Sequence, residues 1–349
     1  MLASLLLTVL LCPALPRAQP APAAADPFQV SLAKLKDADM QVRRQGAEEL
    51  GESRRPEAVP ALAEALQDES PVVRALCAEA LGTLRSAEAV APLSRTLASD
   101  RDKEPRRSAA AALASIGTPA AVAPLAAALE KDPDPEVRCA IARALGILRA
   151  AAAADSLAKA LKDPDPLLRR CAAAALGRIG SRESAPALQA ALADADPGVR
   201  LEAARSLGAV ADPAAAPALR DALRDADPAV RLTAAQSLAR LGDSSGLPEA
   251  FAALRSSDTV ARQLSAGILG LAGDPQSGLP ALEKAYAEET DPGTKTVIDF
   301  ARIQLKARLG IKEAPPEKAP AAAPAAGKKP AAKKKPAPAK PRRRPARPG

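Results

Sequence analysis

The 349-residue chain contains no histidine and no tryptophan, and it has only one tyrosine and three phenylalanines. Without histidine, the chain has no His-based catalytic triad, no His general base and no His ligand for zinc or iron. So few aromatic side chains leave neither a base-stacking surface for single-stranded nucleic acid nor an aromatic hot spot for a partner. A glycine-rich phosphate loop is also missing. We therefore predict a binding protein rather than an enzyme, with no catalytic residue, no cofactor and no metal site.

What the chain does contain is a repeat. A unit of 31 to 32 residues recurs eight times between residues 37 and 292, and each copy has one arginine at the same place. These arginines are Arg43, Arg74, Arg106, Arg138, Arg169, Arg200, Arg231 and Arg262. Alanine always follows four residues later and leucine three residues after that, as in Ala110 and Leu113. Spacings of three and four predict one apolar helix face, and no stretch alternates with the period of two that indicates a strand.

Capping residues bound the helix of each unit. Asp or Ser stands four residues before each arginine, often followed by proline, as in Asp134-Pro135. This pair is typical of a helix N-terminus, since the side chain accepts an unpaired N–H and proline lacks one. Gly117, Gly180, Gly242 and Gly273 come eleven residues after the arginine, and we expect left-handed C′ residues there. A second helix follows, with two leucines four residues apart and an early proline that should disturb its first turn.

The unit Asp-x-Asp-Pro-x-Val-Arg-x-x-Ala-Ala-x-x-Leu-Gly, with its leucine-rich second helix, resembles the HEAT-repeat family. It is similar to the short repeats of phycobilin lyases over roughly residues 27 to 309. The resemblance implies an all-α, armadillo-like α-solenoid (superhelix) of about eight HEAT-like helix pairs. Residues 27–36 and 293–309 should form half-repeat caps, with Phe300 in the leucine position of the second. Eighteen helices are therefore expected.

The recurring arginine has two interpretations. A row of guanidinium groups at constant spacing suits a polyanion, but an acid also stands six residues before all but the last of these arginines. The acids are Asp37, Asp68, Asp100, Asp132, Asp163, Asp194 and Asp225. The resemblance implies that these Asp and Arg side chains bond within and between repeats as a structural ladder. We favour the ladder, because arginine suits bidentate pairing with a carboxylate.

The basic character of the chain lies in its C-terminal tail. Residues 311–349 contain twelve Lys and Arg against two Glu, whereas residues 1–310 contain 37 basic and 39 acidic residues. Frequent proline and the lack of aromatics predict a disordered Lys/Arg/Pro/Ala-rich tail that resembles, in composition only, those of linker histones. Its clusters are candidate polyanion contacts: Lys328, Lys329, Lys333, Lys334, Lys335, Arg342, Arg343 and Arg344. The alternative is a solvated spacer without a ligand.

The N-terminus resembles a secretory leader. Leu2 to Leu11 form a ten-residue apolar run, and Ala23 and Ala25 offer small residues for cleavage. The run is too short to span a bilayer, so we predict a signal peptide over residues 1–25 and no transmembrane span. No Lys or Arg precedes the run, which leaves an upstream start open. Cys12 as a lipoprotein acylation site is a further alternative, although Leu11 before it is not small.

Export would leave Cys77, Cys139 and Cys171 in the mature chain. An odd number without C-x-x-C spacing is a poor disulfide framework or metal site. Cys139 and Cys171 lie in successive repeats, where helix axes are about 8–10 Å apart, and a disulfide needs Cα atoms within about 4.4–6.8 Å. We therefore expect all three to be buried small apolar residues.

These observations predict three parts: the leader, a solenoid over residues 26–310 and the tail. The favoured function is a non-enzymatic scaffold, secreted or periplasmic and monomeric, that binds another protein on the solenoid surface. The alternative is a cytoplasmic protein that binds nucleic acid or another polyanion through the tail. A HEAT-like lyase or hydroxylase relative is a more distant alternative. The His-Glu iron site that a resemblance to deoxyhypusine hydroxylase would imply has no counterpart here.

Overall fold

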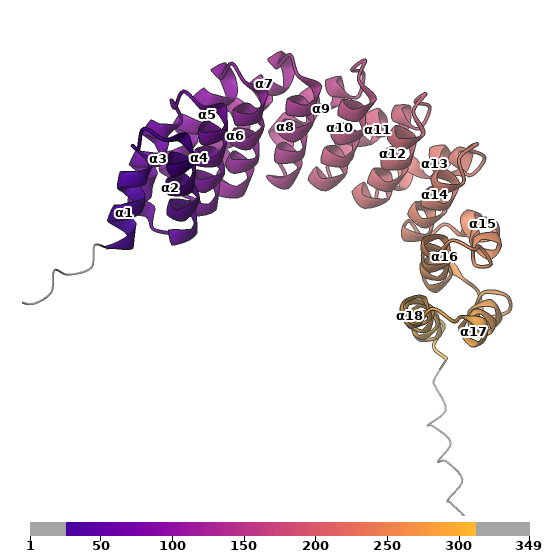
Figure 1. Cartoon of the computed structure of the whole chain (residues 1–349). Coiled ribbons are helices and arrows are strands. Elements are labelled where there is room, and N and C mark those ends of the chain that lie inside the picture. Colours follow the sequence, from indigo (N-terminus) through magenta and orange to yellow (C-terminus); the bar gives the residue numbers. More distant parts are fainter. Residues whose placement is uncertain (1–25, 312–349) are drawn as a thin grey trace, which may run out of the picture. The chain divides into compact units, whose positions relative to one another are not determined.

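The computed structural model describes residues 26–311, which form two rows of helices without any β-strand. Eighteen α-helices follow one another in chain order, as the repeat count predicts. Even-numbered helices pack on the next even-numbered helix, and odd-numbered helices cover one side of that stack (Figure 1). The even-numbered helices lie on the inner side of the curve and are called the inner row, and the odd-numbered helices are called the outer row.

The inner row contains the first helix of every repeat and the C-terminal cap. Its members are α2 (Met40–Ser53), α4 (Pro71–Leu84), α6 (Lys103–Ile116), α8 (Pro135–Ile147), α10 (Pro166–Ile179), α12 (Pro197–Val210), α14 (Pro228–Arg240), α16 (Thr259–Ala272) and α18 (Pro292–Arg308). The outer row contains α1 (Pro27–Lys34), α3 (Val59–Ala65), α5 (Val90–Ser99), α7 (Val122–Lys131), α9 (Ala154–Ala160), α11 (Ala185–Ala191), α13 (Ala216–Ala222), α15 (Leu247–Ala253) and α17 (Gly278–Glu288).

Helix α8 illustrates how the local sequence starts an inner-row helix. The carboxylate of Asp134 accepts the N–H groups of Glu136 and Val137, and Pro135 occupies the first helical position. Helices α4 and α6 also begin at the expected residues, but Ser70 and Asp102 make no side-chain cap bond. The Asp102 carboxylate instead pairs with Arg74. The cap residue therefore marks the boundary even where its side chain serves another contact.

The outer-row helices α3 to α15 are each preceded by a one-turn 3-10 helix. These turns are Pro56–Ala58, Ala87–Ala89, Pro119–Ala121, Ala151–Ala153, Arg182–Ser184, Pro213–Ala215 and Ser244–Gly246. Pro60 and its counterparts enter the α-helix directly after the turn. The expected disturbance thus takes the form of a 3-10 turn ahead of the α-helix. Proline in the first turn of that α-helix costs no helical bond, because the N–H groups there have no partner within the helix.

The core is the stripe predicted from the repeat. The alanine and leucine that follow the repeat arginine are fully buried in every copy, as in Ala110 and Leu113 at 0% exposure. Between neighbouring inner helices the packing is closest at glycine. A Cβ on Gly177 of α10 would approach Ser206 Cβ of α12 to 2.7 Å and Ser206 Cα to 3.0 Å. Small side chains therefore let successive helices stack at short range.

The helix ends differ from the expectation at several repeats. Gly117, Gly180 and Gly242 adopt positive φ as predicted, but Gly273 is extended, with φ −60° and ψ 156°. In the other repeats the left-handed position carries a residue with a side chain, namely Arg54, Arg85, Arg149 and Ala211, with φ between 48° and 54°. For an L-residue this conformation costs about 1 kcal/mol relative to glycine. Three arginines are thus held in a backbone conformation that glycine adopts freely.

In the C-terminal cap, Phe300 does not lie where the sequence predicted it. Helix α18 buries Thr294, Ile298, Ala301 and Leu305, whereas Phe300 is 68% exposed. The prediction of Phe300 in the leucine position was wrong, because α18 has no further repeat after it and packs with a different stripe. Among residues 26–311 no helix combines the length and hydropathy needed to cross a bilayer.

Candidate binding surface

The repeat arginines form a ladder along the array, and all of them except Arg231 join their own repeat to the next. Arg106 is representative: its Nε donates to Asp132 Oδ2 at 2.8 Å and its Nη2 donates to Asp132 Oδ1 at 3.1 Å. Its Nη1 donates to the Asp100 carbonyl oxygen at 2.9 Å, within its own repeat. Corresponding inter-repeat pairs are Arg43–Asp68, Arg74–Asp100, Arg138–Asp163, Arg169–Asp194 and Arg200–Asp225.

Two further pairs complete the ladder with glutamate. Arg231 pairs with Glu249 of α15 at 3.2 Å, and Arg262 pairs with Glu289 at 2.7 Å. The sequence pattern missed both: Ser256 stands at the position of the acid that would pair with Arg231, and no further repeat arginine follows Arg262 to mark its acid. Glu289 had a usable signal: it lies six residues before Lys295, which follows the cap Asp291 by the same four residues as each repeat arginine. Extending the repeat register into the half-repeat would have found it.

The ladder carboxylates also organise the loops before the inner helices. Asp37 has no arginine before it, and its Oδ1 accepts the Asp39 N–H at 2.8 Å. Asp194 accepts both the Arg169 guanidinium and the Asp196 N–H at 2.8 Å. The hydrogen bond from Arg169 holds the pKa of Asp194 below its usual value, and Asp194 in turn raises the pKa of Arg169. These arginines are therefore occupied by the protein itself and do not form a row of open cationic groups.

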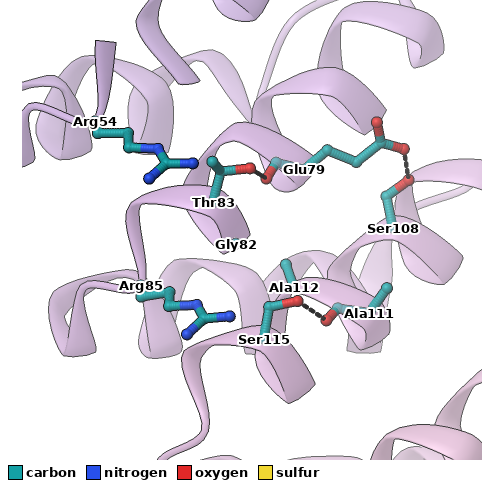
Figure 2. Close-up of a pocket in the computed structure, with 9 residues that line it drawn as sticks. All are labelled: Arg54, Glu79, Gly82, Thr83, Arg85, Ser108, Ala111, Ala112 and Ser115. Carbon is teal, nitrogen blue, oxygen red and sulfur yellow. Dashed lines mark hydrogen bonds between the residues drawn. The ribbon is translucent and has the colours of Figure 1, made fainter. Parts of the chain in front are cut away.

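Arginine side chains without an ion-pair partner lie instead on the solvent side of the inner row, which is the face that the outer row does not cover. Figure 2 shows the hollow between α4 and α6, which holds about 540 Å³. Arg54 and Arg85 extend into it, and Ser108 Oγ donates to Glu79 Oε1 at 2.9 Å across its far side. Neither arginine makes an ion pair among residues 26–311. The hollow thus offers guanidinium and hydroxyl groups on a floor of glycine and alanine.

A second hollow, of about 890 Å³, lies along α8, α10 and α12 and is called the arginine hollow. Five arginines line it: Arg143, Arg149, Arg170, Arg178 and Arg205. The repeat pattern did not predict this group, because the pattern contains only residues that recur at the same position, and these arginines stand at different positions in different copies. The signal was present one, five and nine residues after the ladder arginine, where Arg170, Arg143 and Arg178 stand.

A disulfide lies in the wall of the arginine hollow. Cys139 of α8 and Cys171 of α10 are bonded, with their Cα atoms 5.4 Å apart. The expectation of three separate buried thiols was wrong for this pair. It compared helix axes, whereas facing Cα atoms stand about 2.3 Å off each axis, so axes about 8–10 Å apart leave room for a disulfide. Cys77 remains a free buried thiol, and burial raises its pKa to about 12.

Several predicted features lie outside the described residues or carry no site. The leader, with Cys12, and the tail clusters from Lys328 to Arg344 fall in residues 1–25 and 312–349, beyond the described range. Within residues 26–311, no group of three or more Cys, Asp or Glu is arranged to hold a metal ion.

The geometry defines an α-solenoid: stacked helix pairs, a core between neighbours and an inter-repeat ladder. The sequence profile of HEAT repeats matches residues 29–114, 95–166, 154–228 and 216–299. The chain therefore belongs to the HEAT-repeat family. The comparison with curated proteins finds no match.

Solved structures are similar to the chain at low identity. The YibA protein of Escherichia coli is 19% identical with a TM-score of 0.55, over 78% of this chain and 98% of that one, which supports the fold. The CpcE and CpcF complex of phycocyanin lyase from Nostoc is 26% identical with a TM-score of 0.40, over 67% of this chain and 97% of that one. Human deoxyhypusine hydroxylase is 24% identical with a TM-score of 0.34, over 70% and 95%.

Proposed function

We propose that the chain is a non-enzymatic scaffold that holds a partner protein on the solvent side of its inner row. One observation carries this proposal: hollows of about 540 and 890 Å³ lie on that side, and arginines that are not part of the ladder line both. A long array of stacked repeats presents such a surface over many helices, which suits a macromolecule better than a small molecule.

The chemistry of the described side chains supports binding over catalysis. The chain lacks histidine, and its free thiol, Cys77, is buried with a pKa raised to about 12 by desolvation. A thiol in that state is a poor nucleophile, because the thiolate is the reactive form. The carboxylates of Glu79 and Glu202 on the inner row are engaged with Ser108 and Arg205. These groups favour recognition as the role of this surface.

Export is part of the proposal. The apolar run from Leu2 to Leu11 predicts a leader, and the Cys139–Cys171 disulfide supports an oxidising compartment, because disulfides persist in secreted and periplasmic proteins. N-terminal sequencing of the protein from its host should begin near Asp26. Recovery of chain that still starts at Met1 would contradict export.

Site-specific photocrosslinking in the host tests the binding surface. A photoreactive amino acid at Ser115 of α6, exposed on the inner row, should capture a partner protein. The same group at Ala123 of α7, exposed on the outer row, is the matched control and should capture none. Crosslinks that form only from Ala123, or equally from both positions, would contradict an inner-row surface.

The second candidate function is polyanion binding through the basic tail, which the clusters Lys333-Lys334-Lys335 and Arg342-Arg343-Arg344 favour. Binding to duplex DNA or lipopolysaccharide, measured across salt concentrations, should weaken steeply with salt if the tail neutralises anionic groups. Removing residues 312–349 should abolish it. An affinity that survives this truncation would contradict a binding role for the tail.

A further inference from the structure

The arginine hollow concentrates positive charge that the fold does not need. Arg143, Arg149, Arg170 and Arg178 are exposed and make no ion pair or side-chain hydrogen bond among residues 26–311. Arg205 pairs with Glu202 at 2.7 Å, and Glu202 is the one carboxylate in the lining of the hollow. The ladder arginines, by contrast, each have a carboxylate partner. Five guanidinium groups thus surround one hollow with a single acid among them.

Two features keep these charges together despite their mutual repulsion. Arg149 has φ 48°, at the position where the neighbouring repeats carry Gly117 and Gly180 with positive φ. This backbone conformation, which Arg54, Arg85 and Ala211 share in other repeats, sets the direction in which the Arg149 side chain leaves the end of α8. The Cys139–Cys171 disulfide joins α8 and α10, the two helices whose residues and ends supply four of the five arginines. The spacing of the two helix backbones that carry these arginines is therefore constrained before any ligand arrives.

We propose that the arginine hollow binds an acidic, extended segment of the partner protein, with Asp and Glu carboxylates paired to Arg143, Arg149, Arg170, Arg178 and Arg205. This inference rests on the proposed scaffold function and adds the chemistry of the partner. The planar guanidinium group matches a carboxylate in a bidentate fashion, which a lysine does not.

The extent of the hollow fits a short peptide. Three successive inner helices, spaced about 8–10 Å apart, span on the order of 20 Å, which is the length of about six residues of extended chain. The floor between the arginines is made of small residues such as Ala174, Gly177 and Ala209, which leave space for a backbone.

A nucleic acid fits this surface less well. No aromatic side chain lines the hollow, so bases have nothing on which to stack. Further along the inner row, exposed Glu48, Glu52 and Glu79 on α2 and α4 would repel a long polyanion that continued in that direction. Acidic side chains thus interrupt the positive charge toward the N-terminal end of the row.

Fluorescence anisotropy with the mature full-length chain tests the proposal. The probe is a fluorescein-labelled eight-residue Asp/Glu peptide at about 150 mM salt, with a Gln/Asn peptide of equal length and an eight-nucleotide DNA strand as comparisons. Replacing one exposed arginine, as in Arg170→Gln, should weaken acidic-peptide binding by about threefold. Replacing Arg143, Arg149, Arg170 and Arg178 together should weaken it at least about twentyfold if the effects of the separate pairs add.

Arg149→Gly separates binding from folding. Glycine relieves the left-handed backbone, so this variant should be at least as stable as the parent while it binds the acidic peptide about threefold more weakly. Ala211→Gly is the matched control: it relieves the same left-handed backbone at the end of α12, removes no arginine from the arginine hollow, and should leave the affinity unchanged. The unaltered tail is present in both variants, so any tail contribution cancels.

Each outcome bears on a distinct claim. Equal affinity of the variant with four arginines replaced and of Ala211→Gly would overturn the acidic-peptide site, as would DNA binding that is tighter and equally sensitive to these arginines. If crosslinking from Ser115 still captures a partner in that case, the scaffold function stands and only the partner chemistry is wrong. If no partner is crosslinked from Ser115 in the protein without arginine substitutions, the proposed scaffold function is wrong.

Discussion

Arg106 and Asp132 face each other across the boundary between two repeats, and both side chains are buried, with 9% and 3% of their surfaces exposed. Arg106 Nε and Nη2 donate to the two carboxylate oxygens, while Nη1 is satisfied by the Asp100 carbonyl. Nearly every polar atom of the pair therefore has a partner within the protein. Replacing either member of such a pair lowers the free energy of unfolding by more than the pair itself contributes to stability, because the remaining group stays buried without a partner.

Asp132→Asn should lower the free energy of unfolding by about 3 kcal/mol, because it leaves the Arg106 charge buried without a counter-charge. Urea denaturation followed by circular dichroism measures the change. The exposed pair Arg44–Glu48 on α2 is the control, and Arg44→Ala should cost no more than about 0.5 kcal/mol. Equal decreases in the free energy of unfolding for the two substitutions would show that burial does not determine how much a ladder pair stabilises the protein.

Acid should weaken the ladder in a defined range. Hydrogen bonds from Arg169 and Arg200 lower the pKa of Asp194 and of Asp225 below that of an unfolded chain. Their contribution to stability is therefore complete above the ordinary Asp pKa of about 3.9 and is lost as pH falls through the lower pKa of the folded state. Asp194→Asn should be less stable than the parent at pH 7 and should lose less on further acidification. Parallel pH profiles of thermal melting would contradict this.

The two glycines Gly177 and Gly267 should respond to alanine in opposite directions. A Cβ at Gly177 meets Ser206 Cβ at 2.7 Å, so Gly177→Ala should push α10 from α12 and cost about 1–3 kcal/mol. A Cβ at Gly267, inside α16, meets nothing within 4 Å. Gly267→Ala should therefore stabilise by about 0.5–1 kcal/mol through helix propensity. Thermal melting distinguishes them, and a stabilised Gly177→Ala would refute close helix contact there.

Reduction of Cys139–Cys171 should lower stability by about 3–4 kcal/mol in the chain-entropy account, because the cross-link spans 32 residues. Thermal melting with and without reductant measures this. Alkylation provides the chemical check: among Cys77, Cys139 and Cys171, the unfolded unreduced chain should take one label and the unfolded reduced chain three. Three labels without reductant would show that the disulfide is absent from the protein.

Features that recur in every repeat could be read from the sequence. Ala110, Leu113 and their counterparts occupy the same environment in each copy, so one periodic pattern reports the same burial eight times. Eighteen helices and both half-repeat caps followed from the same register. Eight copies of one pattern outweigh a departure in any single copy, so the helices of a repeat array are easier to predict than an isolated helix.

Features that occur once could not be obtained in this way. Phe300 lies where no next repeat covers it, and the Cys139–Cys171 bond depends on how far apart two particular Cα atoms lie. The arginine hollow combines residues such as Arg143 and Arg178 from different positions of different copies. Only the stacking of three helices brings them to one place, so no window of sequence displays them as a group.

The ladder also gives the array a direction. Each repeat supplies the arginine and the following repeat or half-repeat supplies the carboxylate, from Arg43 with Asp68 to Arg262 with Glu289, except that Arg231 pairs within its own repeat. During synthesis the N-terminal repeats emerge first. The newest folded repeat therefore displays one guanidinium group without its acid, except in the seventh repeat, where Arg231 already has Glu249, and the last such defect is at Arg262. It disappears only when Glu289 arrives, so the final half-repeat acts as the stop that completes assembly.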